Sequence, residues 1–131
     1  LKHLPEENAR RGEIARQYGQ LLAPLDLALP QPSIDIVHVF HQYVVKTSRR
    51  DGLQEFLAGR GIATQVHYPM PVHRQPAYRQ RLFSGRRGLP NTESVARQIL
   101  SLPMSPYLKR KDVAMICSAV REAFANDFEP S

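Results

Sequence analysis

The segment Val37–Lys46 reads Val-His-Val-Phe-His-Gln-Tyr-Val-Val-Lys, and it is the strongest strand pattern in the chain. Both alternating sets of side chains contain large apolar residues, which is typical of a strand that is covered at least in part on both faces. Ile62–Tyr68 is a second strand candidate, and Ser101–Pro103 is a shorter third one. We therefore expect a small sheet at the centre of the fold.

Amphipathic helical patterns surround these strand candidates. The first covers Pro5–Leu22, between a proline suited to a first helical turn and Pro24, which ends the pattern. The other three are a short helix after a capping box at Ser48 and Asp51, a helix capped by Asn91 or Thr92, and a last helix from about Lys109 to Ala125. We expect an α+β fold in which these helices pack on one side of a small, mostly antiparallel sheet.

The length of 131 residues fits a single domain. We divide it into a leading helix (1–23), a proline-rich linker (24–36), an α+β core (37–125) and a tail (126–131). The chain begins at Leu1 in a helical pattern, so we expect a fragment of a longer protein. With 42% hydrophobic and 23% charged residues it has the composition of a soluble globular domain, and no apolar stretch is long enough to cross a membrane.

The single cysteine, Cys117, limits the chemistry that the chain can support. It excludes an internal disulfide and favours the reducing cytoplasm. Cys117 lies on the apolar stripe of the last helix, where an inert buried thiol is the usual case. His38 and His41 would lie on opposite faces of a strand, so they cannot bind one metal ion together. Nucleophile-elbow and glycine-rich phosphate motifs are also missing, and we predict no catalytic residue and no metal site.

The net charge of +6 is concentrated in one part of the chain. Between Glu55 and Glu93 there is no acidic residue, and this window holds six arginines: Arg60, Arg74, Arg79, Arg81, Arg86 and Arg87. One interpretation is an anion site for ligand phosphates or nucleic acid; the other is a solvated basic loop. Most of the window lies in the proline-rich stretch 69–90, and a loop of that length inside a compact domain is usually functional or mobile.

The same stretch places His67, Tyr68 and His73 around a proline-rich turn. Two imidazoles and a phenol at a strand end could contact a ligand, and the prolines would stiffen their presentation. The alternative is a set of ordinary strand-end side chains, and the spacing alone favours that alternative.

Several segments together resemble one family. Gly61–Gln75 resembles the "GI-x-T-x-x-HYP-x-P-x-H-x-Q" stretch of the DegT/DnrJ/EryC1/StrS aminotransferases, which are pyridoxal-phosphate-dependent sugar aminotransferases of fold type I. Four further segments agree in order and spacing: Arg11–Leu22, His41–Val45, Leu89–Glu93 and Leu100–Met104. The resemblance runs from about Arg10 to Phe124.

The resemblance covers only the C-terminal small domain of that family. It implies an N-terminal large domain that carries the Schiff-base lysine and the pyridoxal phosphate site, so no cofactor is expected on this chain alone. It also implies transfer of an amino group, commonly from glutamate, to a nucleotide-linked keto sugar by a homodimer. On this view His73, His67 and Tyr68 contact the substrate, and the charge of Arg86, Arg87 and Arg74 suits the nucleotide phosphates.

Two other functions stay open at this stage. The first is a stand-alone binding module that descends from such a domain and has lost catalysis. The second is nucleic-acid binding, which the basic loop suggests but which no recognition motif accompanies, so we rank it last.

Overall fold

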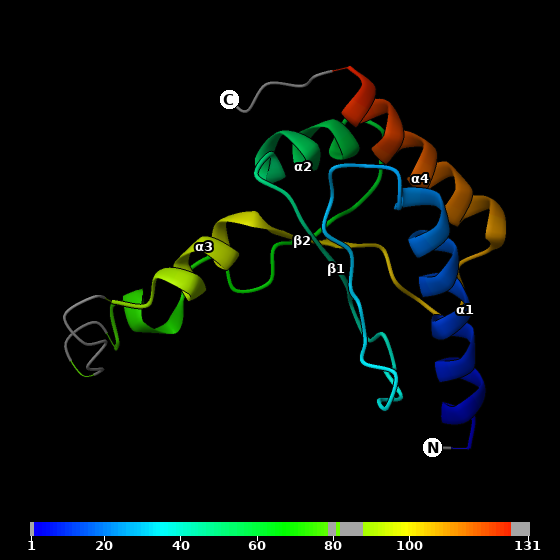
Figure 1. Ribbon diagram of the computed structural model, residues 1–131, viewed down its shortest axis with the longest axis horizontal. Coiled ribbons are helices and arrows are strands. Elements are labelled where there is room, and N and C mark those ends of the chain that lie inside the picture. Colours follow the sequence, from blue (N-terminus) through cyan, green and yellow to red (C-terminus); the bar gives the residue numbers. More distant parts are fainter. Residues whose placement is uncertain (1, 79–80, 82–87, 127–131) are drawn as a thin grey trace.

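A computed structural model describes residues 2–78, 81 and 88–126. Over these residues the chain folds into a small α+β structure, which confirms the predicted class (Figure 1). The order of elements is α1 (Leu4–Leu22), β1 (Tyr43–Lys46), α2 (Arg50–Ala58), the 3₁₀ helix η1 (Val72–Arg74), α3 (Pro90–Gln98), β2 (Ile99–Leu102) and α4 (Arg110–Ala125). No helix in these ranges is both long and apolar enough to span a bilayer.

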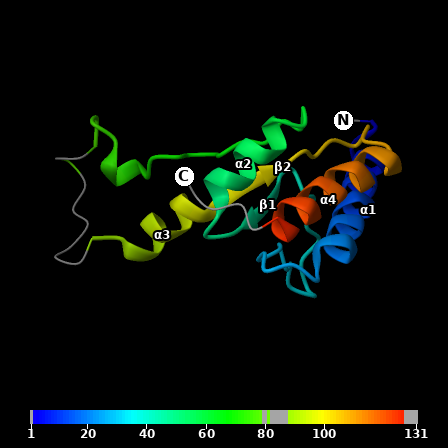
Figure 2. The ribbon, with the colours of Figure 1, turned by 90° about the horizontal axis from the view of Figure 1, so that it is seen from above.

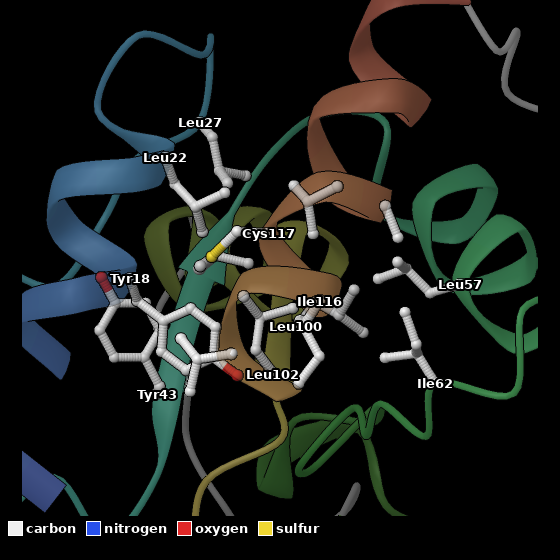
Figure 3. Close-up of a cluster of buried hydrophobic side chains, with 14 of the residues drawn as sticks. Tyr18, Leu22, Leu27, Tyr43, Leu57, Ile62, Leu100, Leu102, Ile116 and Cys117 are labelled. Atoms are coloured by element: carbon white, nitrogen blue, oxygen red, sulfur yellow. The ribbon is translucent and has the colours of Figure 1, made fainter. Parts of the chain in front are cut away.

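The two strands form an antiparallel pair with one face turned to the core. Tyr43 lies opposite Leu102, and Val45 lies opposite Leu100. All four side chains are buried, and side chains two residues apart on a strand share a face. α1, α2 and α4 cover that face, and Figure 3 shows their apolar side chains meeting those of the strands. The predicted arrangement of helices on one side of a small antiparallel sheet is therefore confirmed for α1, α2 and α4.

α1, α2 and α4 pack through the apolar stripes that their sequences predict, whereas α3 buries only Ala96. α1 buries Tyr18 and Leu22, and α4 buries Val113, Ile116 and Val120. α4 begins where the Lys109 N–H donates to the Asp112 carboxylate at 3.0 Å, which satisfies one amide of the helix start. α2 ends in a turn whose Gly61 adopts a φ of +70°, a conformation that glycine enters at little cost.

The expected strand over Val37–Lys46 is wrong for its first six residues. Only Tyr43–Lys46 pairs, and Val37 has 93% of its surface exposed instead of being covered. Phe40 has a left-handed φ of +46°, and its N–H donates to His38 Nδ1 at 3.0 Å. A left-handed residue breaks the extended backbone, so the alternating pattern before Tyr43 has no ladder to join.

The second strand prediction, Ile62–Tyr68, is also wrong. That segment meets the sheet at one antiparallel bridge, between Gln65 and Ser101. Its backbone turns away at Tyr68, which has a φ of +57°. The third strand is longer than expected, at Ile99–Leu102.

The two predicted N-terminal caps are not formed. α2 is preceded by Arg49 and α3 by Leu89, and neither helix has a side-chain cap. α3 begins directly with Pro90, which suits the first helical position because the N–H it lacks would have no partner within the helix.

The fold has a body and an arm. The body holds the sheet with α1, α2 and α4; the arm, residues 69–78 and 88–98, carries η1 and α3 and projects away from it in both views (Figures 1 and 2). α3 passes directly into β2 at Ile99, so the arm continues the sheet without an intervening loop.

Candidate ligand-binding site

The site begins at the edge of β2 that β1 does not use. The Gln65 N–H donates to the Ser101 carbonyl at 3.1 Å, and the Ser101 N–H donates to the Gln65 carbonyl at 2.8 Å. Both main-chain groups of Ser101 are therefore committed to Gln65. This pair holds the segment that leads to His67 alongside the strand.

His67 lies at the sheet face opposite the core. Because Leu100 and Leu102 point into the core, Ser101 between them points to the other face. The His67 Nδ1 atom lies 2.9 Å from the Ser101 hydroxyl, a hydrogen-bond distance. His67 itself lies on a bend, and its imidazole is held by a hydrogen bond to a residue of the strand β2.

A hollow of about 290 Å³ lies beside this imidazole. None of the side chains that line it carries a formal charge when its imidazoles are neutral. They are His41, Gln42, Ala63, Thr64, Gln65, His67, Ser101, Leu102, Pro103 and Met104. Amides, hydroxyls and imidazoles of this kind suit a ligand with uncharged polar groups, such as a sugar ring.

Tyr68 is held in a strained conformation next to His67. Its φ of +57° is rare for a residue with a side chain, and it precedes Pro69, which further restricts the residue before it. The side chain does not gain burial in return, because 78% of its surface is exposed. Strain of this kind concentrates at functional sites, and here it accompanies a phenol displayed on the surface.

His73 and Arg74 meet Glu93 within the arm. The His73 Nε2 atom lies 3.0 Å from Glu93 Oε1, and Arg74 donates from Nε at 3.2 Å and from Nη2 at 2.6 Å. These contacts connect η1 to the first turns of α3. The hydrogen bond from His73, together with the Arg74 guanidinium, lowers the pKa of the Glu93 carboxyl.

A second hollow, of about 700 Å³, lies over this cluster. It is lined by Pro69, Met70, Pro71, His73, Arg74, Glu93, Ala96 and Arg97. It therefore carries formal charges of both signs, unlike the hollow beside His67. The Glu93 carboxylate forms a salt bridge with the Arg74 guanidinium. Arg74 can therefore bind an anion only if this salt bridge breaks.

The predicted site residues are divided between these two places. His67 lines the first hollow, while His73 and Arg74 line the second, and the exposed Tyr68 lies between them along the chain. Arg86 and Arg87 lie outside the described residues. Ser101 and Glu93 are not among the predicted site residues, although both lie in segments that carry the family resemblance. The available signals were a lone polar residue in an apolar strand and the acidic residue that ends the arginine window.

Comparison with known proteins assigns the family. Residues 1–121 match the DegT/DnrJ/EryC1/StrS aminotransferase family. The chain belongs to this family. The His67–Tyr68–Pro69 corner, the His73–Glu93 pair and Ser101 are thus features of a DegT-family domain.

Sugar transaminases are among the curated relatives of this DegT-family chain. One is the dTDP-3-amino-3,4,6-trideoxy-alpha-D-glucose transaminase of Streptomyces venezuelae, 44% identical over 123 residues, which are 93% of the chain and 32% of the relative. Another is the UDP-2-acetamido-2-deoxy-3-oxo-D-glucuronate aminotransferase of Pseudomonas aeruginosa, 33% identical over 92% of the chain and 32% of the relative. The chain thus spans about a third of the length of these relatives.

Solved structures agree with this assignment. DesV of S. venezuelae, in complex with a ketimine intermediate, superposes with a TM-score of 0.88 at 44% identity, over 93% of this chain and 33% of that one. A DegT DnrJ EryC1 StrS aminotransferase from Brucella abortus has the same TM-score of 0.88 at 34% identity, over 95% and 33% of the two chains. The body and the arm are therefore a fold that this family shares.

The two hollows do not form a pyridoxal phosphate site by themselves. That cofactor needs a lysine for its aldehyde and cationic or backbone N–H groups for its phosphate. Within residues 2–78, 81 and 88–126 no lysine lines either hollow, and the Arg74 guanidinium is paired with Glu93. These residues therefore do not fit the cofactor, and the hollow beside His67 is better suited to the uncharged part of a substrate.

Proposed function

We propose that this chain is the C-terminal domain of a longer nucleotide-sugar aminotransferase, and that it supplies contacts to the sugar. The observation that carries the proposal is the corner at His67 and Tyr68. There an imidazole held by Ser101 borders an uncharged polar hollow, and a strained backbone displays a phenol beside it. The names of the two relatives given above, a dTDP-sugar transaminase and a UDP-sugar aminotransferase, support the substrate class.

The residues of this corner bind and orient the sugar; they do not move the amino group. His67 and Tyr68 contact sugar oxygens, with the hollow of about 290 Å³ receiving part of the ring. His73 contacts the substrate or the amino donor from the second hollow, where Glu93 orients its imidazole. Arg86, Arg87 and Arg74 serve the nucleotide phosphates, and Arg74 must exchange Glu93 for phosphate to do so.

The remaining parts of the enzyme lie on polypeptide outside this chain. They comprise the large domain, its lysine and the pyridoxal phosphate that it holds. We further propose that the enzyme is a cytoplasmic homodimer, and that the chain alone does not transfer amino groups.

A domain transplant tests the proposal. The 123 matching residues of the S. venezuelae transaminase are replaced by those of this chain. The chimera is then assayed in the direction that removes the amino group from dTDP-3-amino-3,4,6-trideoxy-alpha-D-glucose with 2-oxoglutarate as acceptor. We expect pyridoxal phosphate to bind and the reaction to proceed in the chimera, and neither to occur with the chain alone.

Matched variants of the chimera test the residues. His67→Ala and Tyr68→Ala should raise the KM for the sugar, whereas Ser118→Ala, an exposed position on α4, should leave it unchanged. A chimera that binds the cofactor but is as active with His67→Ala and Tyr68→Ala as without them would show that the corner does not contact the sugar. Amino transfer by the chain alone would contradict its assignment as a partial enzyme.

A further inference from the structure

Ser101 is an unusual residue for its place in the fold. It is the one polar residue of β2, and only 7% of its surface is exposed. Its backbone groups are already used in the pair with Gln65. A buried hydroxyl costs free energy unless it finds a partner, so its presence in an apolar strand needs an explanation.

The partner that the structure provides is the His67 imidazole. A serine hydroxyl carries one hydrogen and two lone pairs, and a neutral imidazole carries a proton on one nitrogen only. The contact of 2.9 Å from Ser101 Oγ to His67 Nδ1 can therefore be made in two ways. Either the hydroxyl donates to an unprotonated Nδ1, or a protonated Nδ1 donates to the hydroxyl oxygen.

The surroundings distinguish these two arrangements. Among the described residues, His67 is the hydrogen-bond partner of the Ser101 hydroxyl. If Nδ1 donated, the hydroxyl hydrogen would be buried without an acceptor there, which is the costly case for a donor. If the hydroxyl donates, its hydrogen is satisfied and the imidazole proton resides on Nε2.

We propose that Ser101 is a positioning residue that fixes His67 as the Nε2–H tautomer. The imidazole then binds Ser101 with one nitrogen and presents an N–H donor to a ligand with the other. The group that such a donor recognises is an uncharged oxygen with a lone pair, either a sugar hydroxyl or a sugar keto oxygen. This inference rests on the proposed function for its ligand, and on the geometry alone for the tautomer.

The backbone makes the pair specific. Two hydrogen bonds to Gln65 hold the segment before His67 in register with Ser101, and the chain turns at Tyr68 directly after it. His67 therefore has little freedom to leave the hydroxyl. Among the described residues that line this hollow there is no Lys, Arg, Asp or Glu, so no charged side chain competes with Ser101 for the imidazole.

The tautomer can be measured without any activity. The full chain is labelled with ¹⁵N in its histidine rings, and the Nδ1 and Nε2 shifts are recorded at pH 8.5, where unperturbed imidazoles are neutral. His67→Gln removes one set of signals and so assigns it. We expect the Nε2–H form to dominate at His67, and its ratio to the Nδ1–H form to fall about fivefold or more in Ser101→Ala.

Two further variants distinguish the effect of losing the Ser101 hydroxyl from the effect of a general loss of structure. Ser101→Thr keeps the hydroxyl and should keep the tautomer. Thr47→Val removes another buried hydroxyl, which accepts the Arg49 N–H, and should leave His67 unchanged. A far-UV spectrum and a thermal melt check that each variant is folded. A dominant Nδ1–H form in the parent chain, or a ratio that Ser101→Ala does not move, overturns the inference.

The proposed hydrogen bond from His67 to the sugar is tested in the chimera described above. Ser101→Ala should raise the KM for the sugar between about twofold and tenfold, which is the value of one hydrogen bond. It should add nothing when His67 is already alanine, because Ser101 acts through His67. A KM that does not change although the tautomer does overturns the proposed donor contact. An inactive chimera together with the expected tautomer instead contradicts the proposed function and leaves the positioning role of Ser101 in place.

Discussion

Tyr18→Phe tests how the body of the fold is held together behind the site. The Tyr18 hydroxyl donates to the Pro103 carbonyl at 2.8 Å, and the side chain is completely buried. Its ring lies 4.8 Å from that of Tyr43 between centroids. Figure 3 labels both rings. Pro103 follows β2 and lines the hollow beside His67, so this bond connects α1 to the edge of the candidate site.

The substitution removes one oxygen atom and keeps the ring. At pH 7 we expect the free energy of unfolding to fall by about 1–2 kcal/mol, which combines the net value of the hydrogen bond with the cost of leaving a carbonyl without its donor. The apolar contacts of the ring with Tyr43 and Leu22 are unaffected, so a larger loss is not expected.

The effect should depend on pH with a defined sign. Burial raises the pKa of Tyr18, and the neighbouring Cys117 and Tyr43 raise it further. Since the pKa in the folded state lies above the unfolded value of 10.0, the parent chain has the full contribution of Tyr18 below pH 10 and loses it as the pH rises further. At pH 11 ionisation of this residue in the unfolded state favours unfolding by about 1.4 kcal/mol.

Phenylalanine cannot ionise, so the variant does not share this loss. The difference in unfolding free energy between the parent and Tyr18→Phe should therefore shrink from about 1–2 kcal/mol at pH 7 to nearly zero at pH 11. Urea unfolding followed by circular dichroism at pH 7, 10 and 11 measures it. Tyr107→Phe is the matched control, because Tyr107 is 79% exposed and its hydroxyl only reaches Glu7 at the surface. A difference that stays constant across this range would refute the assignment of Tyr18 as a buried, hydrogen-bonded phenol.

Three other perturbations address the strain, the arm and the buried thiol. Tyr68→Gly should stabilise the chain by about 1 kcal/mol, because glycine relieves the left-handed strain, while Tyr68→Ala should not; equal melting temperatures would contradict a strained Tyr68. Glu93→Gln should speed protease cleavage within the arm and leave the melting temperature of the body nearly unchanged. Because the pKa of Glu93 is lowered, its carboxylate in the parent chain stays ionised to a pH below the usual carboxyl range, and the tether is lost only as the pH falls through that lowered pKa. Burial raises the pKa of the Cys117 thiol to about 12, so iodoacetamide should modify it only as urea unfolds the chain, and rapid labelling of the folded chain at pH 8 would contradict its place in the core.

The helices α1, α2 and α4 were predictable because each repeats an apolar stripe of its own. The stripe of α1, with Tyr18 and Leu22, and that of α4, with Val113 and Val120, need no knowledge of the rest of the chain. Such a local signal determines which residues form a helix, and packing then decides only which neighbour covers the stripe.

The strands were less predictable because a strand depends on a partner. The alternation in Val37–Lys46 continues through residues that pair with nothing, and the left-handed backbone of Phe40 separates them from the four that do. The true partner of β1 begins at Ile99, more than fifty residues later, in a segment whose pattern alone indicates only three strand residues. Pairing over that separation is a tertiary property, and periodicity does not encode it.

The same reason explains which site residues the sequence identifies. His67 and Tyr68 are visible because they lie together in one segment with its prolines. Ser101 and Glu93 act on histidines that precede them by 34 and 20 residues, so their roles appear only when the fold brings each pair within hydrogen-bond distance.

β2 is the element on which the body, the arm and the site all depend. Its first residue continues α3, its third binds Gln65 and His67, and the proline that follows it accepts the Tyr18 hydroxyl. Because neighbouring residues of a strand point to opposite faces, Leu100 faces the core while Ser101 faces the candidate ligand. Substitutions one position apart should therefore have separate effects: at Leu100 mainly on stability, and at Ser101 mainly on the tautomer of His67 and the affinity for the sugar. A strand of four residues can in this way hold the core and position His67 without requiring one side chain to do both.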